Sequence, residues 1–489
     1  MTAQRDVLNE IARRAMEERG LRAEFAPEAL AQAAAVQATG PTQEPAVQDL
    51  RDLAWSSIDN DDTLDIDQLS VSAPGSDGAV RLLVAIADVD AFVPRGSAID
   101  EHAHANTTSV YTAASVFPML PVTLSTDLTS LREGQERLAM VVDMAVTPDG
   151  AVAASLVYRA RVWNRAKLTY DTVAAWLDGR APAPAGVSKV PTLDEQLRLQ
   201  EQLAAAMKKR RHERGALTLE TSGARPVFDG GRLVDMRPDE KNRAKSLIEE
   251  LMIAANSSVA GFLERAGFPS IRRVLRSPYR WDRIVELAAA AGETLPALPD
   301  AVALERFLTH RRAAAPATFA ELSLAVVKLL GAGEYVVGLP TEISHDHFGL
   351  AMQDYAHSTA PNRRFPDLVT QRMLKAAIDQ RPSPYAQHEL AAMATHCSRQ
   401  EDNAAKVERQ VRKSAAALLL SSRLGERFLS VVTGASPKGT WVRIARPIVE
   451  GQLVRGYEGV DVGDRIEVTL TSVDVERGLI DFARDVRTP

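Results

Sequence analysis

Three aspartates near the start of the chain, Asp59, Asp65 and Asp67, are spaced so that they could bind a metal ion. Asp65 and Asp67 are two residues apart, so on an extended segment their side chains point to the same face. Asp59 can join them across a short loop. Carboxylates gathered this densely repel one another unless cations lie between them, and hard oxygen ligands suit magnesium or manganese. The cluster therefore predicts a divalent metal site.

Two other motifs could account for the aspartate segment. A calcium-binding helix-loop-helix motif begins in a similar way, but it needs a glycine at its sixth place and a glutamate at its twelfth. Counting from Asp59, these places hold Leu64 and Ser70, so the calcium motif is excluded. The remaining alternative is a polar turn in which the aspartates accept hydrogen bonds from backbone amides.

A second segment, distant in the sequence, carries further candidate residues. Residues 356–367 read Ala-His-Ser-Thr-Ala-Pro-Asn-Arg-Arg-Phe-Pro-Asp. Between the two segments lie Leu-Leu-Val-Ala-Ile-Ala-Asp-Val (82–89), Phe-Pro-Met-Leu-Pro (117–121) and Leu-Ile-Glu-Glu-Leu-Met-Ile-Ala-Ala-Asn (247–256). In this order and at this spacing, the motifs resemble the catalytic (RNB) domain of the ribonuclease II/R family. The resemblance covers most of the chain.

The resemblance implies that four acidic positions hold metal ions or their water. Three of them match as Asp59, Asp65 and Asp67, of which Asp67 is also implied to be catalytic. The fourth position is Gln68, which keeps a carbonyl oxygen but removes one negative charge. We therefore expect the second metal to bind more weakly. Magnesium is the expected cofactor, and manganese is possible; two ions about 3.5–4 Å apart can activate water and stabilise the leaving oxygen.

Arg363 matches the catalytic arginine of the family. A guanidinium beside the scissile phosphate can donate two hydrogen bonds to its oxygens and stabilise the charge that grows in the transition state. The surrounding loop departs from the usual Thr-Ser-Pro-Ile-Arg-Arg-Tyr at Ala360, Asn362 and Phe365, which puts the shape of the loop in doubt. A structural arginine paired with Asp367 is the alternative.

Three more residues are implied to bind RNA. Tyr111 matches the aromatic residue that stacks on a base near the 3′ end, and Arg364 is expected to contact the backbone of the strand. Glu408 matches a carboxylate near the terminal nucleotides. Glu408 also precedes Arg412 by four residues, so an ordinary ion pair on a helix explains it nearly as well.

Composition sets broader limits. The chain has 489 residues and a formal charge of -6, a balance that does not by itself indicate nucleic-acid binding, although local basic stretches can still follow a phosphate backbone. Cys397 is the single cysteine, so no intrachain disulfide can form and the reducing cytoplasm is the expected location. No apolar run is long enough to span a bilayer, and no membrane association is expected.

The chain is expected to fold in three regions, the first two of which are an N-terminal helical unit at 1–45 and an α/β (α+β) RNB catalytic domain at 46–424. The N-terminal unit has apolar residues at helical spacing. It is either a helix-turn-helix or winged-helix-like unit, or a helical cap packed on the catalytic domain. In the catalytic domain, strand-like runs are expected at 80–93 and 138–146, and a long helix at 387–424.

The third region, residues 425–489, has short β-prone runs separated by glycines. This rhythm is typical of a small five-stranded barrel. Gly-Asp-Arg-Ile-Glu-Val (463–468) and Gly-Leu-Ile-Asp-Phe (478–482) resemble the OB-fold RNA-binding domain that commonly ends ribonuclease II relatives. A barrel that only braces the enzyme is the alternative.

Together, these resemblances imply a magnesium-dependent hydrolytic 3′-to-5′ exoribonuclease. It would degrade single-stranded RNA to 5′-nucleoside monophosphates by in-line attack of water at two metals. Single-stranded RNA is the expected partner, and a monomer is favoured. Two rival interpretations remain: a catalytically impaired RNA-binding regulator that keeps the channel, and a metal-dependent DNA nuclease.

Overall fold

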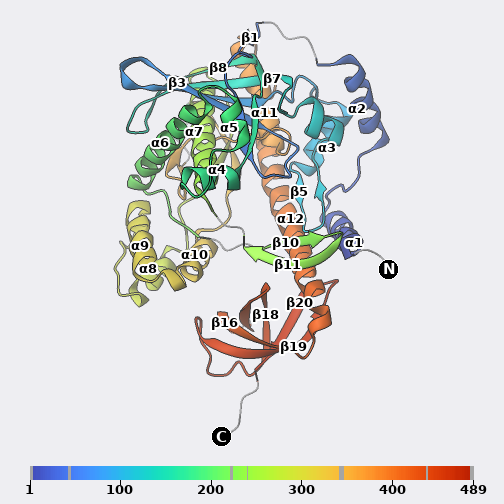
Figure 1. The fold of residues 1–489 in the computed structure, drawn as a ribbon, viewed down its shortest axis with the longest axis vertical. Coiled ribbons are helices and arrows are strands. Elements are labelled where there is room, and N and C mark those ends of the chain that lie inside the picture. The colour runs from blue at the N-terminus through green and yellow to red at the C-terminus, as the bar shows by residue number, and fades with distance from the viewer. Residues whose placement is uncertain are drawn as a thin grey trace.

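A seven-stranded sheet forms the centre of the catalytic region (Figure 1). The computed structural model describes residues 4–41, 46–220, 224–238, 241–340, 346–436 and 439–484. In sheet order, the strands are β1 (Gln48–Asp49), β8 (Val152–Trp163), β7 (Glu136–Val146), β4 (Val80–Ala87), β3 (Gln68–Pro74), β2 (Ser56–Asp59) and β9 (Ala166–Thr169). The β1–β8 and β2–β9 pairs are parallel, and the other neighbours are antiparallel.

Both faces of the sheet are covered, which explains why β4 is apolar at nearly every position. Leu82, Val84 and Ile86 pack beneath helices, whereas Leu83 and Ala85 face a second core on the opposite side. The strands expected at 80–93 and 138–146 are therefore confirmed as β4 and β7. β4 ends at Ala87 rather than at 93, because the next residues turn away from the sheet.

Helix α7 (Arg243–Arg265) lies across β2, β4, β7 and β8. Its buried face includes Leu247, Leu251, Ala255 and Val259, at the helical spacing that the sequence predicts. Helices α4 (Tyr170–Leu177), α6 (Leu193–Glu213) and α11 (Phe365–Ile378) contact α7. Helix α5 (Ala185–Lys189) contacts α6 and β9, and α3 (Ala98–Asn106) contacts α2.

The long helix α12 (Gln387–Leu420) connects the catalytic region to the barrel (Figure 1). Helix α1 (Gln4–Glu17) packs against α12, whereas α2 (Pro27–Thr39) packs against α3. The expected N-terminal helical region is thus confirmed. Because its two helices contribute to different core clusters, their arrangement is that of a helical cap on the catalytic region.

Smaller elements complete the catalytic region. Helices α8 (Trp281–Ala290), α9 (Ala301–Ala314) and α10 (Pro316–Leu330) share a separate apolar core. The short antiparallel pairs are β5 (Val110–Tyr111) with β6 (Val116–Phe117), β10 (Ala224–Asp229) with β11 (Arg232–Pro238), β12 (Ser270–Val274) with β13 (Glu334–Gly338), and β14 (Asp346–His347) with β15 (Met352–Gln353). Among the described residues, no helix is long and apolar enough to cross a membrane.

The C-terminal region is a closed barrel, which confirms the expected five-stranded fold. In barrel order its strands are β16 (Arg427–Ser436), β17 (Gly439–Ala445), β18 (Ile448–Arg455), β20 (Leu479–Ala483) and β19 (Arg465–Asp474). Strand β18 runs through a glycine, Gly451. A Cβ atom at Gly451 would lie 2.6 Å from the carbonyl oxygen of Ile480 and 2.6 Å from Phe482, so the close approach of β20 requires this glycine.

We therefore predict that Gly451→Ala destabilises the barrel by about 2 kcal/mol, because backbone and a core ring must move to admit the methyl group. Gly434→Ala is the matched control, because its Cβ would meet only Trp441 at 3.4 Å. Hydrogen exchange of the barrel amides measures the effect. Equal protection in the two variants would contradict this account of β18.

Candidate active site

The predicted site residues gather where three strands of the sheet end and a helix begins. Asp59 is the last residue of β2 and pairs with Thr169 at the end of β9. Asp65 and Asp67 lie in the segment that leads into β3, and Arg363 immediately precedes the N-terminal region of α11. Two segments almost 300 residues apart in the sequence therefore meet at one edge of the sheet.

Asp67 is the most buried of the three carboxylates, with 3% of its surface exposed. Its Oδ1 accepts a hydrogen bond from the backbone N–H of Asn362 at 3.1 Å, and its Oδ2 accepts one from Nε of Arg363 at 3.2 Å. The side chain of Arg363 remains 41% exposed, so the guanidinium can also reach a bound molecule. Asp67 and Arg363 thus form the contact that links the two segments.

The loop between Asp59 and Asp65 is fixed by polar contacts. Asp59 Oδ1 accepts hydrogen bonds from the backbone N–H of Asn60 at 2.7 Å and from the hydroxyl of Thr63 at 3.1 Å. Lys167 of β9 donates to the carbonyl oxygens of Asp61 at 3.2 Å and Thr63 at 2.6 Å. These contacts hold the loop in the shape that brings Asp59 towards Asp65. Lys167 was missed by the sequence analysis, because only the parallel pairing of β9 with β2 brings it here.

The electrostatics of the cluster show an excess of negative charge. Burial raises the pKa of Asp67 to about 7; the nearby charge of Asp65 adds to the shift, and Arg363 opposes it. Burial also raises the pKa values of Asp59 and Asp65, and Asp59 adds to the shift of Asp65. One guanidinium is insufficient to offset three carboxylates that are partly or fully removed from water.

The neighbouring arginine, Arg364, faces a different partner. Its Nη2 donates to Asp367 Oδ1 at 2.7 Å and its guanidinium is largely buried. Asp367 also accepts a hydrogen bond from the backbone N–H of Ala360 at 2.8 Å, which holds the loop before α11. The pairing with Asp367 that was considered for Arg363 is thus made by Arg364. A contact from Arg364 to an RNA strand stays a prediction.

Tyr111 lies beside the aspartates, and Glu408 lies behind it. The hydroxyl of Tyr111 donates to Asp65 Oδ2 at 3.4 Å, and 41% of the residue is exposed. Glu408 Oε1 accepts a hydrogen bond from the backbone N–H of Tyr111 at 2.9 Å. Burial raises the pKa of Glu408, and the Tyr111 N–H and the charge of Arg412 oppose that shift. Glu408 therefore holds the backbone of Tyr111 in place and also interacts with the charge of Arg412.

Gln68 is not joined to the aspartates by a hydrogen bond in the part of the chain that the structure describes. It is the first residue of β3 and lies opposite Ile86 of β4, whose side chain belongs to the core beneath the helices. Because Gln68 follows Asp67 in an extended segment, the two side chains point in opposite directions. Its place as a metal ligand remains a prediction.

Tyr170 is a further neighbour that the sequence analysis missed. Burial raises the pKa of its hydroxyl; the charge of Asp59 adds to the shift and the charge of Arg363 opposes it. The next residue, Asp171, lines a cavity of about 1150 Å³ between α4, α6 and α7. Pockets of this size can hold a small organic ligand.

The donor set of the cluster suits a hard divalent cation, because all three side chains offer carboxylate oxygens and carry uncompensated charge. Within the described ranges, no three Asp, Glu, His or Cys side chains already converge as a complete metal site. Arg363 occupies Asp67 Oδ2 instead. A cation at the cluster would therefore compete with Arg363 for this oxygen.

Comparison with known proteins assigns the family. Residues 47–380 match the RNB domain, and residues 426–485 match the RNase II-type exonuclease C-terminal S1 domain. The chain therefore belongs to the RNB domain family. Ribonuclease R of Aquifex aeolicus is 29% identical over 479 residues, a match that covers 89% of this chain and 64% of that protein. The chain thus spans less than two thirds of the length of this relative.

Solved structures agree on the fold. RNase R of Mycoplasma genitalium in complex with ribose methylated single-stranded RNA has a TM-score of 0.84 at 21% identity, with 98% of this chain and 78% of that chain covered. Yeast Ssd1, described as a pseudonuclease, has a TM-score of 0.69 at 16% identity and covers 84% of this chain and 51% of that chain. The mixed α/β architecture is therefore shared by proteins described as nucleases and by one described as a pseudonuclease.

The raised pKa of Asp67 has a consequence for stability. The pKa of Asp67 is about 7 in the folded protein and 3.8 in the unfolded chain. The stability that protonation of Asp67 contributes is therefore fully present below about pH 4 and is lost as the pH rises through 7. In EDTA at pH 8, we expect Asp67→Asn to raise the free energy of unfolding by about 2 kcal/mol, as measured by urea denaturation.

Asp61→Asn is the control, because Asp61 is an exposed member of the same loop. It should have the stability profile of the unaltered protein. A destabilised Asp67→Asn protein at pH 8 would show that Asp67 is not under electrostatic strain.

Proposed function

We propose that this protein is a magnesium-dependent, hydrolytic 3′-to-5′ exoribonuclease that degrades single-stranded RNA to 5′-nucleoside monophosphates. The observation that carries the proposal is the meeting of Asp59, Asp65 and Asp67 with the exposed guanidinium of Arg363. Membership of the RNB family supports RNA as the substrate. The relatives named Ribonuclease R support the reaction, and the M. genitalium complex supports a single strand as the ligand.

In the proposed mechanism, Asp59, Asp65 and Asp67 hold the divalent ions, magnesium or manganese. When bound, these ions activate a water molecule and neutralise charge on the phosphate. The guanidinium of Arg363 would leave Asp67 and donate hydrogen bonds to the oxygens of the scissile phosphate. There it would stabilise the negative charge that grows in the transition state. The water oxygen would bond to phosphorus and lose a proton, the bond from phosphorus to the 3′-oxygen of the upstream nucleotide would break, and that oxygen would gain a proton.

Other residues of the chain would position the RNA. We assign Tyr111 to base stacking, because its ring is exposed beside Asp65; such a stack contributes about 1–3 kcal/mol whatever the base. Glu408 would keep Tyr111 in place. Selectivity for RNA over DNA would come from contacts to the 2′-hydroxyl.

The domain assignment is part of the proposal. Residues 1–45 would be a helical unit, residues 46–424 the RNB catalytic domain, and residues 425–489 an OB-fold RNA-binding domain. We also propose a monomer that acts in the cytoplasm, where single-stranded RNA is available and where the one cysteine, Cys397, stays unpaired.

A catalytically impaired RNA-binding regulator is the second candidate. Two observations favour it: Gln68 replaces an acidic residue, and the same fold occurs in yeast Ssd1, which is described as a pseudonuclease. The two candidates differ in one measurable result, because only the exoribonuclease releases mononucleotides from end-labelled RNA.

We predict that Arg363→Ala slows the release of mononucleotides from an oligoadenylate by about 100- to 1000-fold, because a donor to the transition-state charge is lost. RNA retention in a gel should change much less. Arg409→Ala is the control, because Arg409 is an exposed arginine of α12 that forms no ion pair with the three aspartates among the described residues, and the activity of this variant should be unchanged. RNA binding without mononucleotide release by the unaltered protein would select the regulator instead.

The fourth acidic position has its own test. We expect Gln68→Asp to lower the magnesium concentration needed for half-maximal activity, because it restores a negative charge beside Asp67. The magnesium dependence of initial rates measures this change. An unchanged titration would place residue 68 outside the set of metal ligands while leaving the role of the three aspartates intact.

A further inference from the structure

The hairpin that carries Tyr111 is too small to hold its own shape. Strands β5 and β6 have two residues each, and Tyr111 pairs with Val116 beside the pair of Val110 and Phe117. An isolated two-stranded hairpin is marginally stable at best in water. The hydroxyl of Tyr111 adds little, because its hydrogen bond to Asp65 is 3.4 Å long. The elements packed against the hairpin therefore set the position of Tyr111.

The underside of the hairpin shares one apolar core with helices α1 and α12. Val110 and Phe117 of the hairpin belong to the same buried cluster as Leu8 and Ile11 of α1. The guanidinium of Arg13 on α1 also lies over the ring of Phe117, 5.7 Å from its centre. Burial attaches the hairpin to this core, but burial is not directional and does not fix the orientation of the turn.

A hydrogen bond joins α1 directly to the turn of the hairpin. The hydroxyl of Ser115 donates to Oδ1 of Asn9 at 2.6 Å. The turn is closed by Thr112, whose backbone N–H and hydroxyl both donate to the carbonyl oxygen of Ser115, at 3.0 and 2.7 Å. Thr112 directly follows Tyr111 in the chain. Because a hydrogen bond is directional, the contact at Ser115 restrains the backbone that carries Tyr111.

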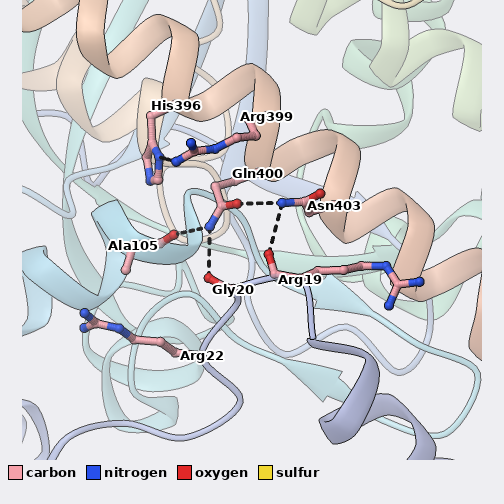
Figure 2. A pocket seen from close by; sticks show the side chains of 8 residues that line it. All are labelled: Arg19, Gly20, Arg22, Ala105, His396, Arg399, Gln400 and Asn403. Atoms are coloured by element: carbon pink, nitrogen blue, oxygen red, sulfur yellow. Dashed lines mark hydrogen bonds between the residues drawn. The ribbon is translucent and has the colours of Figure 1, made fainter. Parts of the chain in front are cut away.

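Helix α1 is itself fixed to α12, as Figure 2 shows for the turn after α1. Asn403 of α12 donates to the carbonyl oxygen of Arg19 at 3.1 Å, and Gln400 donates to that of Gly20 at 3.3 Å. Helix α12 also supplies Glu408, which accepts a backbone N–H of β5 at 2.9 Å. The hairpin is therefore held by two helices that are bonded to each other.

We propose that Asn9 is a positioning residue for RNA binding, which acts through Ser115 to hold the ring of Tyr111 where it stacks on a base. This inference rests on the proposed function, in which Tyr111 is the stacking residue. Asn9 lies outside residues 47–380, the range that matches the RNB domain. The N-terminal helical region of this chain thereby takes part in the site without touching the RNA.

Hydrogen exchange of the full-length protein without RNA tests the physical link. We expect Asn9→Ala to speed exchange in a peptide spanning residues 107–119 by about fivefold, because the turn loses a directional bond. Asn9→Asp keeps an acceptor oxygen for the hydroxyl of Ser115, so its exchange should be that of the unaltered protein. Gln37→Ala is the matched control, because Gln37 is an exposed amide residue of α2, which packs against α3.

RNA binding then separates positioning from a general structural role. The probe is a single-stranded oligoadenylate with 2-aminopurine near its 3′ end, titrated in EDTA and followed by the fluorescence quenching that stacking causes. We expect Tyr111→Ala to weaken binding at least about fivefold, and Asn9→Ala about threefold. The variant with both changes should bind no more weakly than Tyr111→Ala alone, because Asn9 acts through Tyr111.

The outcomes distinguish this inference from the proposed function. Equal exchange in Asn9→Ala and the unaltered protein, unchanged RNA binding by Asn9→Ala, or additive losses in the variant with both changes would overturn the inference alone. No RNA binding by the unaltered protein, or unchanged binding by Tyr111→Ala, would overturn the stacking role in the proposed function and this inference with it.

Discussion

The contact between Asp67 and Arg363 is the interaction on which the candidate active site depends. It joins the segment before β3 to the segment before α11, at 3.2 Å between Oδ2 and Nε. The single positive charge of Arg363 does not neutralise the cluster, because Asp59 and Asp65 carry further negative charge. Burial raises the pKa of all three carboxyl groups. A site with such an imbalance is prepared to bind a cation and to release its arginine to another anion.

The surrounding fold keeps these charges together against their mutual repulsion. The parallel pairing of β2 with β9 brings Lys167 to the loop after Asp59. On the other side, Asp367 holds both Arg364 and the backbone of Ala360, which fixes the turn that presents Arg363. These contacts outside the cluster offset the electrostatic repulsion among the three carboxylates, as is common at functional sites.

Much of this arrangement could be predicted from the sequence. The spacing of Asp65 and Asp67 indicated that they share a face, and the resemblance to the family placed Arg363 beside them. The sequence could not show that Arg364, and not Arg363, pairs with Asp367, because the start of α11 turns Arg364 towards this carboxylate. Lys167 and Tyr170 were missed because the parallel pairing of β9 with β2 brings Lys167 to the site, and Tyr170 directly follows β9.

The central claim is that the three aspartates form a metal site in which a cation displaces Arg363 from Asp67. Anomalous diffraction from crystals soaked in manganese tests it most directly. The account predicts a manganese peak within coordination distance, about 2.2 Å, of oxygens of Asp59, Asp65 or Asp67, with the guanidinium of Arg363 moved off Asp67. A structure in saturating manganese that has no peak at these carboxylates, and in which Arg363 still bonds Asp67, would contradict it.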